Sequence, residues 1–148
     1  MANGREDPLV GCQFSLEIQG VVTGYFTEVS GLGSEHEIIE HKVVDQSGHD
    51  VIMKIPGRMK WNDITLKRGI TSAIDIWDWR KQVEDGDVEG ARKNGSVVMY
   101  DQSYSQVARW NFVNAWPSKV TGPSLSAQNN DFGIEEMVIV HEGIERVN

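Results

Sequence analysis

The N-terminal part of the chain alternates apolar and polar side chains, and this pattern restricts its fold. Apolar residues occupy every second position from Cys12 to Ile18, with polar residues between them. Successive side chains of a β-strand point to opposite faces, so a period of two predicts one buried face and one solvated face. Similar short segments recur along the chain, and its 15 glycines suggest many turns between them. The pattern favours a mainly antiparallel β-protein.

The 148 residues are enough for one domain with a real core, and residues 1–8 are expected to form a flexible arm. Gly24 is expected to mark a bulge or a close approach of the backbone. With one helix beside the strands, we predict an antiparallel β-sandwich or barrel carrying a packed α-helix. The strands are predicted at residues 12–18, 21–29, 35–44, 51–55, 61–67, 96–100, 107–116 and 134–142.

One helix is predicted over residues 72–85. Ser72 followed by Asp75 is a capping-box pattern, and Gly86 suits the position just after the helix. Apolar side chains cover more than half of the helical wheel, which is wider than the stripe of about 100° that a surface helix needs. The helix therefore either contacts a second surface or lies deep in its own domain. If it contacts a second surface, the residues expected at that surface are Asp75, Trp77, Asp78, Trp79 and Lys81.

Charge and composition exclude several classes of protein. The net charge is −8, with 22 acidic residues against 14 basic ones, which argues against a specific nucleic-acid binder. The single cysteine, Cys12, excludes an intrachain disulfide. No segment approaches the roughly 20 apolar residues of a membrane span, and residues 1–9 lack the apolar core of a signal peptide. We expect cytoplasmic synthesis and folding, without direct membrane insertion.

The motifs that suggest chemistry are incomplete. His36 and His41 are five residues apart, whereas a zinc protease helix needs two histidines four residues apart. The acidic residues at 85, 87 and 89 resemble the opening of a calcium loop, but Ser96 stands where that loop needs its glutamate. No phosphate-binding glycine pattern occurs. We predict no catalytic residue, no metal site and no cofactor.

Formal charge is distributed unevenly along the chain. Residues 51–69 hold five basic side chains and one acidic one, whereas residues 75–89 hold six acidic and two basic ones. Residues 28–40 add four acidic side chains and no lysine or arginine. Opposed patches on one chain suit head-to-tail self-association, although a mixed soluble surface explains the counts equally well.

Several short motifs occur in an order that resembles a known family. They are Leu-Lys-Arg-Gly-Ile-Thr at residues 66–71, Asn-Ala-Trp-Pro at 114–117 and Gly-Pro at 122–123, supported by segments 14–20, 26–32, 55–57 and 141–143. Together they resemble the tail tube proteins of contractile phages and of phage-like bacterial contractile injection systems. The resemblance covers nearly the whole chain from Asp7.

This resemblance implies a structural protein whose copies form hexameric rings stacked into a hollow tube inside a contractile sheath. The implied partners are further copies of the chain, the sheath protein, baseplate or spike proteins, a tube-terminating protein and cargo in the lumen. The residues expected on a ring-stacking hairpin are Asp45, Ser47, His49, Lys54 and Arg58. The residues expected to line the lumen with an acidic wall are Gln13, Ser15 and Glu17.

Two other functions remain open from the residues alone. A monomeric β-sandwich module that binds carbohydrate or protein would display Trp61, Tyr100, Tyr104 and Trp116 on one edge. A hydrolase on a β-scaffold is the third possibility. Oligomeric state separates the first of these from a tube protein, because the module would stay monomeric and bind a ligand.

Overall fold

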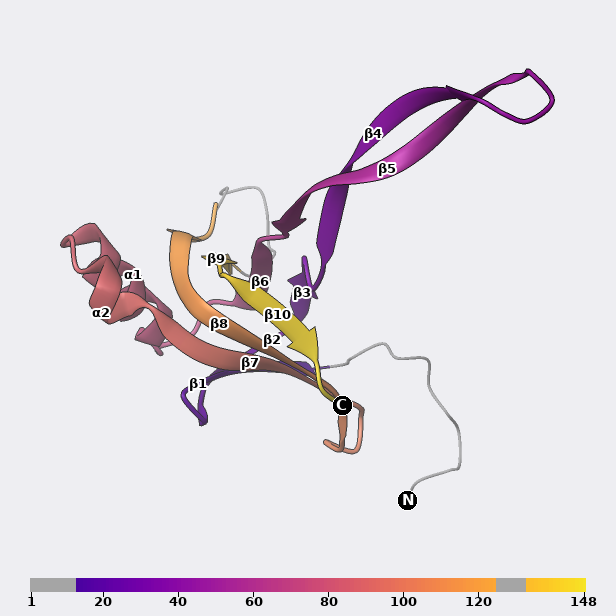
Figure 1. The fold of residues 1–148 in the computed structure, drawn as a ribbon. Coiled ribbons are helices and arrows are strands. Elements are labelled where there is room, and N and C mark those ends of the chain that lie inside the picture. The colour runs from indigo at the N-terminus through magenta and orange to yellow at the C-terminus, as the bar shows by residue number, and fades with distance from the viewer. Residues whose placement is uncertain (1–12, 125–132) are drawn as a thin grey trace.

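The computed structural model describes residues 13–124 and 133–148, so Cys12, the expected arm at residues 1–8 and part of the predicted loop at 118–131 lie outside the described residues. The described chain forms a β-rich body from which one long two-stranded hairpin projects (Figure 1). Two helices lie against one side of the body. All strand pairs in the body and in the hairpin are antiparallel.

An eight-stranded sheet builds the body. Its strands follow the order β2-β1-β7-β8-β9-β6-β3, and β10 pairs with the first half of β8. The strands are β1 (Gln13–Ile18), β2 (Val21–Phe26), β3 (Glu28–Ser30), β6 (Ile64–Gly69), β7 (Lys93–Tyr100), β8 (Gln106–Thr121), β9 (Ile134–Val140) and β10 (Gly143–Arg146). The two ends of the path, β2 and β3, are consecutive in the chain. The sheet therefore curls into a barrel-like wall, and the Thr27 N–H between these strands donates to the Lys67 carbonyl at 2.9 Å.

The core lies between the curled sheet and the first helix. Its largest buried side chains come from β1, β2, β6, β8 and β9, as their alternating patterns require: Leu16, Phe26, Ile64, Leu66, Phe112, Met137 and Ile139. Helix α1 (Asp75–Glu84) adds Ile76 and Trp79 to this cluster. The Trp79 indole N–H donates to the carbonyl of Ala91 at 2.7 Å, which ties α1 to the short helix α2 (Val88–Ala91).

The predicted helix is confirmed, but its start is wrong. Helix α1 begins at Asp75, with Ile74 as a cap residue that makes no side-chain capping bond. Ser72 lies before the helix, where the Thr71 hydroxyl instead accepts the Ala73 N–H at 3.2 Å. The predicted end is confirmed, because Gly86 has φ of 96° directly after the cap residue Asp85. Left-handed backbone of this kind suits glycine.

The strand predictions are confirmed in outline, but several bounds are wrong. The strand predicted at residues 21–29 is divided into β2 and β3, and the strand predicted at residues 61–67 begins only at Ile64. Strand β5 (Asp50–Trp61) is much longer than residues 51–55, and β8 continues through Pro117 to Thr121. The register of β8 shifts between Pro117 and Lys119, which accommodates a residue without an N–H. Strand β10 and helix α2 were not expected. The close approach at Gly24 is confirmed, since a Cβ there would lie 2.7 Å from Nη1 of Arg68.

Candidate assembly surfaces

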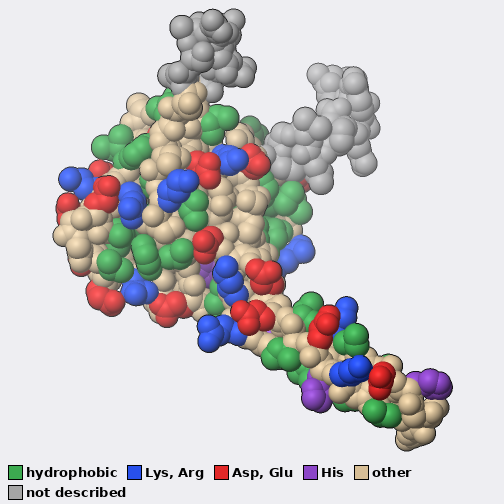
Figure 2. Space-filling model, turned by 90° about the horizontal axis from the view of Figure 1, so that it is seen from above, with side chains coloured by type: hydrophobic (Ala, Val, Ile, Leu, Met, Phe, Trp, Pro, Cys, Tyr) green, Lys and Arg blue, Asp and Glu red, His purple; other side chains and the backbone are tan. Residues whose placement is uncertain are grey.

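The long hairpin is the most exposed part of the described chain. It consists of β4 (Ser34–Val44) and β5, which pair with each other and with no other described strand. Eleven residues of β4 span about 36 Å at about 3.3 Å per residue, so most of the hairpin lies beyond the body. Figure 2 shows apolar and charged side chains exposed along its length. A two-stranded hairpin is marginally stable by itself, so this one needs a surface to pack on.

The two faces of the hairpin differ in chemistry. Directly opposite residues of antiparallel strands share a face. The pairs Val43–Val51, His41–Met53 and Ile39–Ile55 form one face, which we call the apolar face. The opposite face, which we call the charged face, contains the pairs Val44–Asp50, Lys42–Ile52, Glu40–Lys54 and Ile38–Pro56. The apolar face carries no Asp, Glu, Lys or Arg side chain between these pairs, so it is the better candidate for burial.

The hairpin tip is held by its own hydrogen bonds. Asp45 Oδ1 accepts backbone N–H groups from Ser47 at 2.9 Å and from His49 at 2.8 Å. Gly48 has φ of 80°, which closes the turn. The stacking candidates Asp45, Ser47, His49, Lys54 and Arg58 are all exposed, so the structure leaves them available to a neighbour.

The helix candidates divide into exposed and buried residues. Asp75, Asp78 and Lys81 are exposed, and Trp77 is 36% exposed while its indole N–H donates to Glu135 Oε1 at 2.8 Å. Trp79 is only 8% exposed. The expectation that Trp79 faces a partner is therefore wrong, because the core needs this side chain. The helix presents a narrower apolar surface than predicted, partly because Ala73 and Ile74 precede its first turn.

The basic patch predicted at residues 51–69 is also smaller than expected. Arg68 is buried, and its Nε donates to Glu135 Oε2 at 2.9 Å. Its guanidinium lies over the Phe26 ring, 5.1 Å from the ring centroid. Arg68 therefore serves the interior of the protomer, and the exposed basic side chains of this segment are Lys54, Arg58 and Lys60 on β5, with Lys67 half-buried.

The predicted lumen residues lie on the face of β1 that points away from the hydrophobic core, opposite Leu16. Gln13 is half-buried, whereas Ser15 is fully buried with its Oγ 3.1 Å from the hydroxyl of Tyr100. Glu17 accepts two hydrogen bonds from Arg109, the shorter at 3.0 Å. Ser15 is thus not an exposed lumen residue in the protomer, and the Glu17 charge is paired. This strand does not present the simple acidic surface that we expected.

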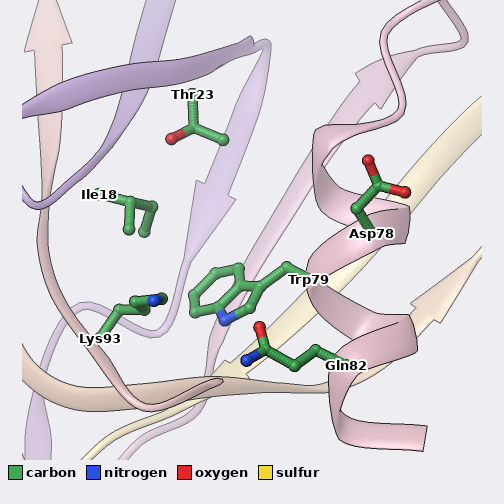
Figure 3. A pocket seen from close by; sticks show the side chains of 6 residues that line it. All are labelled: Ile18, Thr23, Asp78, Trp79, Gln82 and Lys93. Atoms are coloured by element: carbon green, nitrogen blue, oxygen red, sulfur yellow. The ribbon is translucent and has the colours of Figure 1, made fainter. Parts of the chain in front are cut away.

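A hollow of about 250 Å³ lies between α1 and the β1–β2 hairpin. Figure 3 shows its lining: Ile18, Thr23, Asp78, Trp79, Gln82 and Lys93. Two of its polar groups are already used, because the Trp79 indole N–H binds Ala91 and the Gln82 amide donates to Asp87 at 2.9 Å. Part of the polar lining thus takes part in hydrogen bonds within the fold itself.

Within residues 13–124 and 133–148, no group of three His, Cys, Asp or Glu side chains is arranged to hold a metal ion. Asp87, of the suspected calcium loop, instead caps α2 by accepting the Gly90 N–H at 3.0 Å. No helix in the described part of the chain is long and apolar enough to cross a lipid bilayer.

The geometry is therefore that of a small β-barrel with a projecting hairpin and well-separated exposed surfaces. The chain matches the T4-like virus tail tube protein family (gp19) over residues 10–145. It belongs to that family. The match covers well over half of the sequence, and it confirms the resemblance read from the ordered motifs.

Solved structures similar to this tail tube protein agree in fold. The PVC sheath-tube complex of an extracellular contractile injection system contains a chain with 24% identity and a TM-score of 0.72, covering 98% of this chain and 93% of that one. The tube-terminating cap of the anti-feeding prophage gives 22% identity and a TM-score of 0.72, covering 99% and 94%. Hcp1 from Flavobacterium johnsoniae gives 19% identity and a TM-score of 0.54, covering 90% and 93%. No curated protein matches the chain at a significant level.

The protein is thus a tail tube protein by family, and its fold is that of these solved structures. A monomeric binding module is not favoured. Three of the four aromatic residues expected on its ligand-binding edge have contacts within the protomer. Trp116 packs against the core, and Tyr100 binds Ser15. Trp61 lies beside His141, with ring centroids 6.0 Å apart. Only Tyr104 is strongly exposed, at 71%.

Proposed function

We propose that six copies of this tail tube protein close into a ring and that rings stack into a hollow tube inside a contractile sheath. The long hairpin supports this proposal most directly. An exposed two-stranded hairpin with an apolar face is costly for a monomer and useful for a subunit that packs on another copy. The protein performs no chemistry in this proposal; it is a rigid conduit and piercing element.

The free edges of the sheet support the proposed closure of the ring. Among the described strands, β2 pairs only with β1, and β10 pairs only with β8. Val21 and Tyr25 on β2 are 67% and 58% exposed. We propose that strands of neighbouring protomers continue the sheet around the lumen, since closure removes the unpaired edges. The lumen-facing candidates are then Gln13 and the Glu17–Arg109 pair.

Contacts outside the ring involve other surfaces. We propose that exposed residues of α1, namely Asp75, Trp77, Asp78 and Lys81, face the sheath. Baseplate or spike proteins and a tube-terminating protein would bind the two ends of the stack, and cargo would pass through the lumen. Synthesis and assembly would take place in the cytoplasm, and the tube would then be part of a phage-like particle or injection apparatus.

The hairpin provides the test of stacking. One variant replaces the tip at residues 45–50 with a two-residue Asn-Gly turn and changes Lys54 and Arg58 to Glu. We expect the fold and single rings to survive, with loss of long tubes in negative-stain electron microscopy. Tubes of wild-type length would contradict the assignment of stacking to the hairpin, and an unfolded variant would place the hairpin in the protomer core.

A further inference from the structure

Two turns of the chain have the same construction. Both begin with Asp-Gln-Ser, at residues 45–47 and at residues 101–103. In each turn one carboxylate oxygen of the aspartate accepts the N–H groups of the third and fifth residues, at 2.8 to 3.0 Å. In each, the N–H of the fourth residue donates to the aspartate carbonyl, at 3.1 Å and 3.0 Å. The hairpin tip can therefore be compared, residue by residue, with the turn between β7 and β8.

The two turns differ at their fourth residue. Both need left-handed backbone there, with φ of 80° at Gly48 and 63° at Tyr104. Glycine adopts this conformation without a steric penalty, whereas a bulky side chain does so rarely. The chain thus uses the favourable residue in one turn and an unfavourable one in the other. Such backbone outliers cluster at functional sites.

No contact among the described residues explains why a tyrosine occupies this strained position. Its side chain is 71% exposed, and its hydroxyl has no hydrogen-bond partner among residues 13–124 and 133–148. It therefore contributes little to the core, although its backbone conformation is strained. Tyrosine is enriched at protein interfaces because it supplies a large contact area with few rotatable bonds.

We propose that Tyr104 is an anchor residue that contacts a second copy of this chain in the adjacent ring. Its turn lies at the lower edge of the body, well away from the tip of the long hairpin (Figure 1). Head-to-tail stacking joins two different surfaces of successive subunits, so a stack that uses the hairpin tip needs a second, distant surface, and the turn that carries Tyr104 offers one. This inference rests on the proposed stacking of rings, and it names Tyr104 as a residue that contacts the adjacent ring.

The decisive variant is Tyr104→Gly, because it copies the fourth residue of the hairpin-tip turn. Relief of the left-handed strain offsets the greater flexibility of unfolded glycine, so we expect thermal unfolding at or above the wild-type temperature. Loss of an interface anchor should raise the protein concentration needed for tube formation about ten-fold or more, with single rings retained. Tyr104→Phe, which keeps the ring, should assemble nearly as the wild type does. Ser103→Ala in the same turn is the matched control and should leave tube length unchanged.

The outcomes separate this inference from the proposed function. Tubes of wild-type length from Tyr104→Gly, in electron microscopy at equal concentration, would overturn the role of Tyr104 and leave the tube proposal intact. A lower unfolding temperature for Tyr104→Gly would also overturn it, by showing that the side chain stabilises the protomer. Failure of the wild type to form rings or tubes would overturn both.

Discussion

Arg68 and Glu135 form an ion pair that is sealed inside the protomer. The Nε–Oε2 distance is 2.9 Å, and the two side chains are 5% and 2% exposed. The other carboxylate oxygen accepts the Trp77 indole N–H at 2.8 Å. One carboxylate therefore links β6, β9 and helix α1. In the described part of the chain, Nη2 of Arg68 is buried without a partner, so the guanidinium depends strongly on Glu135.

Removal of this carboxylate should destabilise the protomer severely. Glu135→Ala leaves a buried guanidinium without its counter-charge, and breaking a buried pair in this way costs about 3–5 kcal/mol. Urea unfolding of the variant should show this loss in the free energy of unfolding. The matched control is Asp85→Asn, which breaks the exposed Lys81–Asp85 pair, 71% and 64% exposed; we expect a loss of about 1 kcal/mol or less. Equal losses in the two variants would contradict the structural role of Glu135.

The two faces of the hairpin should respond differently to a new charge. Met53 and Ile52 are neighbours on β5, 52% and 61% exposed, and they lie on the apolar and charged faces respectively. Met53→Lys places an unpaired ammonium on the face that we expect to be buried, where desolvation costs several kcal/mol. Ile52→Lys places the same group among existing charges. Electron microscopy should show loss of tubes only for Met53→Lys, and the reverse result would mean that the charged face is the buried one.

The Asp87 carboxylate should titrate below its ordinary range. The hydrogen bond from the Gln82 amide, followed by that from the Gly90 N–H, lowers the pKa of Asp87. A carboxylate whose pKa is lower in the folded state contributes stability above its unfolded pKa of about 3.9, and this is lost as the pH falls through the folded value. Gln82→Ala removes the larger cause, so NMR titration should show the pKa of Asp87 rising toward its ordinary value. An unchanged pKa would contradict this assignment of the cause.

The period-two pattern predicted most of the body, and it also contains the signal for the buried ion pair. Arg68 follows Ile64 and Leu66 at alternate positions, and Glu135 precedes Met137 and Ile139 in the same way. Both charged residues thus occupy inward-facing positions. A local count of charges places Arg68 in a basic surface patch, because its partner Glu135 is 67 residues away in the sequence. Only the pairing of β6 with β9 places the two residues opposite each other.

Other features could not be read locally. Ser72 and Asp75 match a capping pattern in the sequence. In the structure the Ala73 N–H donates to the Thr71 hydroxyl instead, and the helix begins at Asp75. Strand β10 has only four residues, too few to show an alternation of apolar and polar side chains in the sequence. It is recognised as a strand by its pairing with β8. Ser15 fits the solvated face of β1, yet neighbouring strands and the Tyr100 hydroxyl cover it. Surfaces that face other subunits carry a weaker signal still, because their partners lie on other chains.

Tube formation as proposed requires six copies of the chain around a lumen. Native mass spectrometry of the purified ring species, with electron microscopy of the same sample, measures this directly. We expect a mass six times that of the chain and ring images with a central hole and six-fold symmetry. A strictly monomeric protein at high concentration, both alone and with its sheath protein, would rule out the hexameric ring.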